Sequence, residues 1–194
     1  MHKGRLEAFS DGVLAIVITI MVLELKVPHG EDFAALLPLL PVAGSYLLSF
    51  VYVGIYWNNH HHLFQAVQRI DGAVLWSNLH LLFWLSLLPF ATAWMGENHF
   101  ASATVLVYGA VLIGAAVAYY LLVRALLRCQ PPEAPLARAI GSDRKGKLSL
   151  VVYAAGIAAA PFVPWLGVGL YTLVALLWLV PDRRIEDVLG HGHS

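Results

Sequence analysis

The residues of this sequence best suited to chemistry are polar groups set within long apolar stretches, and three histidines are the most conspicuous. His60, His61 and His62 follow one another, and histidine is the commonest metal ligand in proteins. Consecutive residues of a helix point in different directions, so these three side chains cannot converge on one ion. No Glu-x-x-His or His-Glu-x-x-His spacing accompanies them. We therefore expect no catalytic metal, and we interpret His191 and His193 as part of a polar chain end rather than a chelating pair.

The sequence also lacks the usual motifs of hydrolases and of phosphate-binding proteins. The sequence has no Gly-x-Ser-x-Gly elbow and no glycine-rich phosphate loop. Twelve basic and twelve acidic residues cancel, so no net charge favours nucleic acid. We expect neither an enzyme nor a resident cofactor.

One aspartate, Asp11, lies at the start of an apolar run, where its carboxylate requires hydrogen-bonding partners. The candidates are groups that the order of the helices places at a similar depth: Ser10, His60 or His61, and Asn78. Trp57, a histidine at 60 or 61, and Phe64 recur at helical spacing, so we expect them to share one helix face. We interpret the group as a polar clamp between helices. A proton relay that serves a transporter is the alternative.

The elements that position these residues must be membrane helices. The chain has 194 residues, of which 59% are hydrophobic and only 12% charged, and its mean hydropathy is +0.71. In soluble domains about a quarter of the residues are charged, which is twice the fraction found here. The composition therefore excludes an ordinary soluble protein and predicts an all-α integral membrane protein.

Six apolar windows are long enough, or nearly long enough, to cross a bilayer. Spanning about 30 Å of hydrocarbon takes roughly 20 helical residues. The windows run about 9–27, 33–57, 73–94, 102–127, 148–163 and 166–180. Pro38 and Pro41 fall in the opening turns of the second helix, which we expect to continue to Ile70 and to project its last residues into water. We take the chain as one domain with six transmembrane helices.

The basic residues predict the orientation of these helices. If both chain ends lie on one side, that side carries eleven of the twelve lysines and arginines, and only Lys26 lies on the other. Basic residues mark the cytoplasmic side of a membrane protein. We therefore expect a multi-pass protein of the cell membrane with both termini in the cytoplasm. The basic loop 129–147 is either a solvated loop or a contact for anionic head groups.

The first helix has an unusual pattern. Only twelve uncharged residues separate Asp11 from Glu24, or about 18 Å of helix, which is short of the hydrocarbon core. Such a helix fits a position surrounded by other helices or beside water. With a rotation of about 100° per residue, four side chains of this helix fall within a sector of roughly 100°. They form an apolar stripe with a single hydroxyl: Ile16, Thr19, Ile20 and Leu23. The pattern alone is compatible with lipid contact, core packing or a pore.

Several motifs resemble one family. Residues 5–11, RLEAFSD, match the R-x-x-x-F-S-D signature that opens the first helix of the lysosomal potassium channel family (transmembrane protein 175 type), and residues 12–23 are similar to the rest of that helix. The second helix resembles the family's W-x-x-H-H segment at 56–64 and 69–71. The third helix of this chain resembles the third helix of that family at 75–79 and 87–90.

The resemblance implies a cation channel without a P-loop filter, in which four copies of a six-helix subunit surround a central pore lined by their first helices. Carried over by position, Ile16 forms the hydrophobic constriction, with Thr19, Ile20 and Leu23 beside it. The resemblance also implies that the Phe-Ser-Asp motif is a packing clamp between the first helix and the second and third. Its residues on the first helix are Arg5, Phe9, Ser10 and Asp11. Its residues on the other two helices are Trp57, His60, His61 and Asn78.

The expected activity is passage of potassium and other monovalent cations through a homotetramer in the lipid bilayer. A narrow apolar neck gates by losing its water, and without a carbonyl filter the preference for potassium over sodium should be modest. Glu24 either concentrates cations at the outer mouth or is a solvated helix end paired with Lys26. A proton-coupled secondary transporter is the alternative function.

Overall fold

The computed structural model describes residues 2–131 and 144–179, and every regular element in these two ranges is a helix. Most of the predicted basic loop and the terminal histidines lie outside the described residues. In chain order the elements are α1 (Lys3–Leu23), the 3-10 helix η1 (Phe33–Leu39), α2 (Leu40–Gln65), α3 (Gly72–Ser86), α4 (Leu88–Glu97), α5 (Ser102–Cys129), α7 (Arg144–Ala159) and α8 (Pro164–Leu179).

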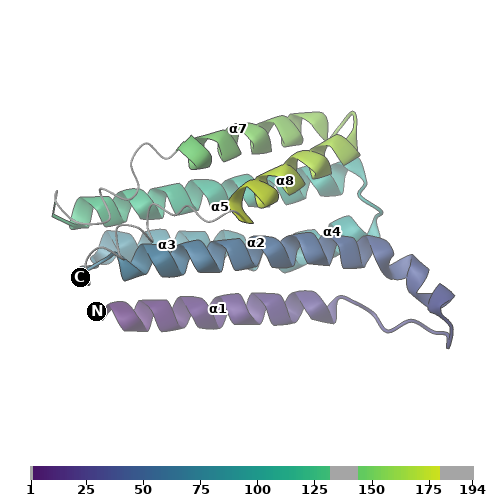
Figure 1. Ribbon diagram of the computed structural model, residues 1–194, viewed down its shortest axis with the longest axis horizontal. Coiled ribbons are helices and arrows are strands. Elements are labelled where there is room, and N and C mark those ends of the chain that lie inside the picture. The colour runs from purple at the N-terminus through teal and green to yellow at the C-terminus, as the bar shows by residue number, and fades with distance from the viewer. Residues whose placement is uncertain (1, 132–143, 180–194) are drawn as a thin grey trace.

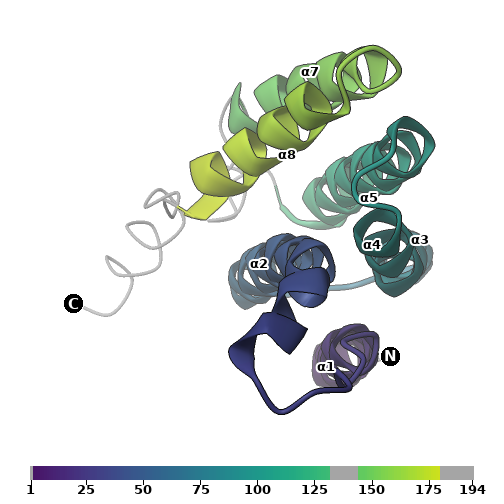
Figure 2. The ribbon, with the colours of Figure 1, turned by 90° about the vertical axis from the view of Figure 1, so that its right-hand side faces the viewer.

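The helices lie side by side along the long axis of the molecule (Figure 1). Viewed from one end, α1 occupies one side of the bundle and the α7–α8 hairpin the opposite side, with α2 to α5 between them (Figure 2). α1 packs against α2, α3 and α4, whereas α7 packs against α5 and α8. α1 therefore has neighbours within its own chain on one side only.

Four segments are long and apolar enough to cross a membrane: 3–23, 33–65, 72–97 and 102–129. α7 and α8 have 16 residues each, about 24 Å of helix, which is shorter than a typical hydrocarbon core. The helix ends differ from the prediction by several residues. α1 runs from Lys3 to Leu23 rather than over 9–27, and α7 runs over Arg144–Ala159 rather than 148–163.

The second helix begins later than predicted. Residues 33–39 form the 3-10 helix η1, whose N-cap Asp32 accepts a hydrogen bond from the backbone N–H of Ala35 (3.1 Å), and α2 begins only at Leu40. Pro38 lies inside η1, and Pro41 lies in the first turn of α2, where its missing N–H has no partner within the helix.

α2 also ends at Gln65 rather than at Ile70, because distant side chains hold the backbone that follows it. The amide oxygen of Gln130 accepts from the N–H of Gln68 (3.1 Å), and its amide nitrogen donates to the carbonyl of Arg69 (2.8 Å). Lys3 Nζ donates to the carbonyl of Val67 (3.2 Å). These groups take the places that helical hydrogen bonds would fill.

The predicted helix 73–94 is broken into α3 and α4 at Leu87. Asp71 caps the start of α3 by accepting from the N–H of Val74 (2.9 Å). Pro89 lies in the first turn of α4, so the N–H that would bond the carbonyl four residues earlier is missing. At the end of α3, the hydroxyl of Ser86 donates to the carbonyl of Phe83 (2.7 Å).

The core of the bundle contains hydroxyl groups that bond one another. Ser49 on α2 lies 2.6 Å from the hydroxyl of Thr92 on α4 and 2.9 Å from that of Tyr108 on α5. Tyr52 donates to the carbonyl of Tyr171 on α8 (2.6 Å). Among the described residues, every buried side-chain nitrogen and oxygen has a partner. Polar groups in an apolar interior thus join four helices without an unsatisfied atom.

Candidate functional site

α1 has two faces of different character. One face is buried against α2, α3 and α4 and consists of Leu6, Ser10, Leu14, Val17 and Met21. The face roughly opposite contains the predicted stripe. Ile16 is 60% exposed, Ile20 43% and Leu23 74%, and Thr19 is exposed as well. The helix is anchored by one face and presents an apolar stripe on the other. It lies at the side of the bundle (Figure 2).

Thr19 is the one hydroxyl on the exposed stripe. Its Oγ1 donates a hydrogen bond to the carbonyl of Ala15 one turn earlier (2.8 Å). Because the hydroxyl hydrogen is directed along the helix, the lone pairs of the oxygen remain available on the exposed side. Such an oxygen can replace a water molecule beside a passing cation.

Behind the buried face, three side chains from three helices form a hydrogen-bonded chain. Ser10 on α1 donates to the carbonyl of Leu6 (2.9 Å) and accepts from the amide nitrogen of Asn78 on α3 (2.9 Å). The amide oxygen of Asn78 lies 2.9 Å from Nε2 of His60 on α2. That oxygen can only accept, so Nε2 of His60 donates. Ser10, Asn78 and His60 are all buried and tie α1 to its two neighbours.

Asp11 has a different partner from those predicted. Its Oδ1 accepts from the indole N–H of Trp57 (3.0 Å) at the exposed edge between α1 and α2. The Trp57 ring stacks at 6.0 Å on the ring of His61, which bonds Gln65. Within the described part of the chain, no hydrogen bond joins Asp11 to a histidine, to Ser10 or to Asn78. Ser10 and Asp11 point about 100° apart, which separates the buried chain from this exposed pair.

The predicted shared face of the second helix is divided. His60 and Phe64 are buried, with ring centroids 4.5 Å apart, whereas Trp57 and His61 are exposed. Trp57 was predicted to belong to this group, but its indole N–H was not predicted to be the donor to Asp11. The signal was present, since the indole nitrogen is a donor without an acceptor role.

Arg5 and Phe9 are not brought into the hydrogen-bonded chain. Both are exposed, and Phe9 precedes Ile16 by two helical turns, on the face of the stripe. Among the residues that the structure describes, the Arg5 side chain makes no hydrogen bond or ion pair. The cation that bonds the neighbouring backbone is Lys3.

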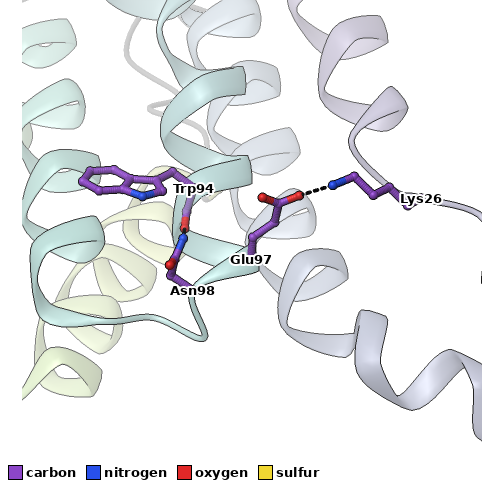
Figure 3. A network of polar contacts seen from close by, with 4 residues as sticks. All are labelled: Lys26, Trp94, Glu97 and Asn98. Carbon is purple, nitrogen blue, oxygen red and sulfur yellow. Dashed lines mark hydrogen bonds and ion pairs between the residues drawn. The ribbon is translucent and has the colours of Figure 1, made fainter.

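At the other end of α1, an ion pair links the loop after the helix to α4. Lys26 Nζ lies 2.6 Å from Oε1 of Glu97, next to Asn98, whose amide donates to the carbonyl of Trp94 (Figure 3). Lys26 therefore pairs with Glu97 and not with Glu24, which is the C-cap residue of α1. The hydrogen bond to Glu97 and the charge of its carboxylate raise the pKa of Lys26. The positive charge of Lys26 is therefore retained in the pair until the pH rises through that raised value.

No group of three or more metal-ligating side chains is assembled within residues 2–131 and 144–179. The ring centroids of His61 and His62 lie 5.8 Å apart with their planes at 63°, whereas His60 is buried on another side of α2.

Comparisons with known proteins identify related chains. A family model described as the endosomal/lysosomal potassium channel TMEM175 matches residues 5–89. A potassium channel from Chryseobacterium sp. strain P1-3 is 57% identical over 189 residues, which cover 97% of this chain and 98% of that protein. The human endosomal/lysosomal proton channel TMEM175 is 36% identical over 103 residues, which cover 47% of this chain and 20% of that protein.

The fold is also similar to a solved structure. The crystal structure of a lysosomal potassium-selective channel TMEM175 homologue from Chamaesiphon minutus aligns with a TM-score of 0.78 and 29% identity, over 93% of this chain and 97% of that one. The family model matches α1, α2 and most of the α3–α4 segment, and the bacterial relative matches almost the whole length. The chain belongs to the TMEM175 family.

Proposed function

We propose that this chain is the subunit of a potassium-permeable cation channel, in which four copies surround a pore lined by the exposed face of α1. The observation that carries the proposal is the apolar stripe of Ile16, Ile20 and Leu23, exposed on a helix at the side of the bundle. The relatives named as potassium channels support the choice of ion.

The proposed mechanism needs no carbonyl filter and no cofactor; potassium is the cargo. Four Ile16 side chains around an axis would form a neck from which water withdraws when it is narrow. Four Thr19 oxygens would replace part of the hydration shell of an ion beside the neck. Potassium gives up its water at lower cost than sodium, so the pore would favour it modestly. Phe9 and Leu23 would line the two approaches.

The distribution of charge supports a cell-membrane protein with both chain ends in the cytoplasm. The segments that end or begin at one end of the bundle carry nearly all the described cations: Lys3, Arg5, Arg69, Arg124, Arg128, Lys145 and Lys147. Lys26 lies at the opposite end. By the positive-inside rule the basic end faces the cytoplasm. In this arrangement α7 and α8 complete six passes, and Glu24 lies at the outer mouth.

The hydrogen bonds around Asp11 argue against the proton-coupled transporter as the alternative. A relay needs titratable groups in sequence, yet Asp11 bonds an indole and His60 bonds an amide. Neither partner exchanges protons in the physiological range. We therefore expect ions to move down their own gradient without a coupled solute.

The test is ion flux in liposomes that contain the purified protein. Wild type should pass potassium faster than sodium without a proton gradient, and Ile16→Asn should raise the flux and reduce the preference, because a polar neck stays hydrated. Val22→Asn is the matched control, since Val22 is exposed on α1 outside the stripe. If the flux and ion preference of Ile16→Asn equal those of wild type, Ile16 does not form the constriction. Flux that requires a proton gradient or a solute would support the transporter.

A further inference from the structure

A cavity lies between α2, α5, α7 and α8, on the side of the bundle away from α1 (Figure 2). Its volume is about 60 Å³, and the residues that line it come from these four helices, so it is separate from the proposed pore. Of the twelve residues that line it, six are tyrosine or tryptophan and none is charged. A ligand of this cavity is therefore uncharged, because an ion that enters it would lose its hydration without a charged partner.

Most polar groups of the cavity wall bond within the protein. Nε1 of Trp178 donates to Oγ of Ser149 (2.8 Å), and the hydroxyl of Tyr52 donates to a backbone carbonyl of α8 (2.6 Å). Three further hydroxyls also have partners: Tyr119 (the carbonyl of Asn59, 3.4 Å), Tyr120 (the guanidinium of Arg124, 3.3 Å) and Tyr153 (the hydroxyl of Tyr52). Over most of the wall a ligand therefore meets rings and methylene groups.

The hydroxyl of Tyr56 differs from these groups. The residue is only 8% exposed, and its ring meets that of Tyr119 edge-on, with centroids 6.1 Å apart. Among the residues that the structure describes, none forms a hydrogen bond with this hydroxyl. Every side-chain oxygen that is itself buried has a partner in that part of the chain, so the oxygen of Tyr56 must reach open space. Because Tyr56 lines the cavity, its unpaired hydroxyl faces into it.

An acceptor lies one helical turn further along α2. Asn59 lines the cavity on the same helix face as Tyr56, three residues away. Its amide nitrogen donates to the carbonyl of Ile55 (2.8 Å), whereas its amide oxygen has no hydrogen-bond partner within the described residues. The wall thus offers one free donor and one free acceptor side by side. A hydroxyl group is complementary to both, because it can accept from the tyrosine and donate to the amide oxygen.

The size of the cavity limits the rest of the ligand. A volume of about 60 Å³ is well below the roughly 150 Å³ of a cavity that binds benzene, so it holds a short chain rather than a ring. We propose that this cavity binds a short, uncharged aliphatic alcohol, with its hydroxyl between Tyr56 and Asn59 and its chain against the aromatic rings of the wall. A neutral lipid such as a diacylglycerol carries the same hydroxyl, but the small volume favours the free alcohol.

Photolabelling of the purified protein in phosphatidylcholine vesicles with 3-azibutanol, a diazirine alcohol, tests the proposal. In wild type the label should appear on Tyr153 of α7, which lines the cavity and is 2% exposed, and it should saturate as the concentration rises. Peptide mass spectrometry measures the label. 1-Propanol should compete, whereas propylamine and propionate, which are ions at neutral pH, should not. Label that rises linearly with concentration, or equal competition by the ions, would overturn the proposal.

Tyr56→Phe removes the hydroxyl and keeps the ring. It should raise the concentration for half-maximal labelling of Tyr153 about fivefold, the equivalent of one hydrogen bond. Because the label is counted on another helix, the loss of the Tyr56 hydroxyl does not itself alter the readout. Tyr46→Phe is the matched control, since Tyr46 is half-buried on the same helix and does not line the cavity. An unchanged concentration in Tyr56→Phe would overturn the proposal, because the ligand would then be held by apolar contact alone.

A second variant and a lipid arm locate the site and its ligand. Ala116→Leu fills the cavity from α5 and leaves Tyr56 and Asn59 in place, so it should abolish the saturable label. Saturable label that persists in this variant would lie outside the cavity and overturn the proposal. Diolein added to the vesicles should not compete; competition by diolein and not by 1-propanol would assign the site to a lipid hydroxyl and overturn the free alcohol. Labelling does not depend on ion flux, so binding without conduction would contradict only the channel.

Discussion

At the scale of single residues, Asn78 holds the central place behind α1. Its amide satisfies a hydroxyl of α1 with one end and a histidine of α2 with the other, while its own backbone belongs to α3. An amide side chain suits this place because its nitrogen donates to Ser10 while its oxygen accepts from His60. The carboxylate of Asp11 lies outside this buried chain.

Replacing Asn78 by leucine should therefore destabilise the bundle. Ser10 and His60 would each lose a partner in a buried position, at a cost of about 1–3 kcal/mol for each unsatisfied group. Thermal unfolding in detergent, followed by tryptophan fluorescence, measures the loss. Asn98→Ala is the control, since Asn98 is exposed and bonds a carbonyl at a helix end. Equal stability of the two variants would contradict the central role of Asn78.

At the scale of helices, three glycines allow close packing around two large rings. A Cβ on Gly109 of α5 or on Gly156 of α7 would overlap Tyr171 of α8, and one on Gly114 would overlap Trp84 of α3. Small residues let membrane helices approach one another closely. The short α7–α8 hairpin depends on this contact with α5 for its position.

Gly109→Ala should lower stability by about 1–3 kcal/mol, because the buried Tyr171 ring has no space into which to move. Gly54→Ala in α2 should instead raise stability by about 0.5–1 kcal/mol, since a Cβ there meets nothing and alanine favours the helix. The apparent melting temperatures of the two variants are compared in the same detergent. A higher value for Gly109→Ala than for wild type would contradict the packing argument.

The sequence predicted the all-helical fold, the apolar stripe of α1 and the family, because each depends on local periodicity or on a contiguous motif. Periodicity alone left open whether the stripe packs in the core, against lipid or along a pore. The motif in residues 5–11 led to the family that the comparisons confirm. The early end of α2 was not predictable, since it depends on Gln130, which is 62 residues beyond its partner Gln68. The place of Phe9 on the face of the stripe follows from helical spacing alone, although the resemblance assigned Phe9 to the clamp. Which of the available donors meets Asp11 depends in addition on the rotation of α1 against α2.

At the scale of the whole molecule, we expect the hydrogen bond between Asp11 and Trp57 to lie near a neighbouring subunit in the proposed tetramer, because it is at the exposed edge beside α1. Trp57 remains 46% exposed beside its aspartate partner. A large ring held in one orientation at an exposed edge is suited to an interface. Assembly is therefore the property that this pair should control.

Asp11→Ala should reduce the yield of tetramer and leave ion preference unchanged. Asp11→Asn should retain assembly, because its amide oxygen still accepts from the indole. Size-exclusion chromatography with light scattering measures the tetramer fraction, and liposome flux measures the preference. Tetramers of full yield with altered selectivity would place Asp11 in the pore instead.

The break between α3 and α4 has a consequence for how a neck at Ile16 would widen. α1 is attached to α3 through Asn78 near its start and touches α4 through Met21, whose sulfur lies 4.0 Å from Oγ1 of Thr92, near its end. Ile16 lies between these two attachment points. A continuous helix over 72–97 would move both as one rigid rod. Because α3 and α4 meet at Leu87 and do not form one continuous helix, we expect the two attachments to move separately, which would let α1 tilt as a whole and displace Ile16.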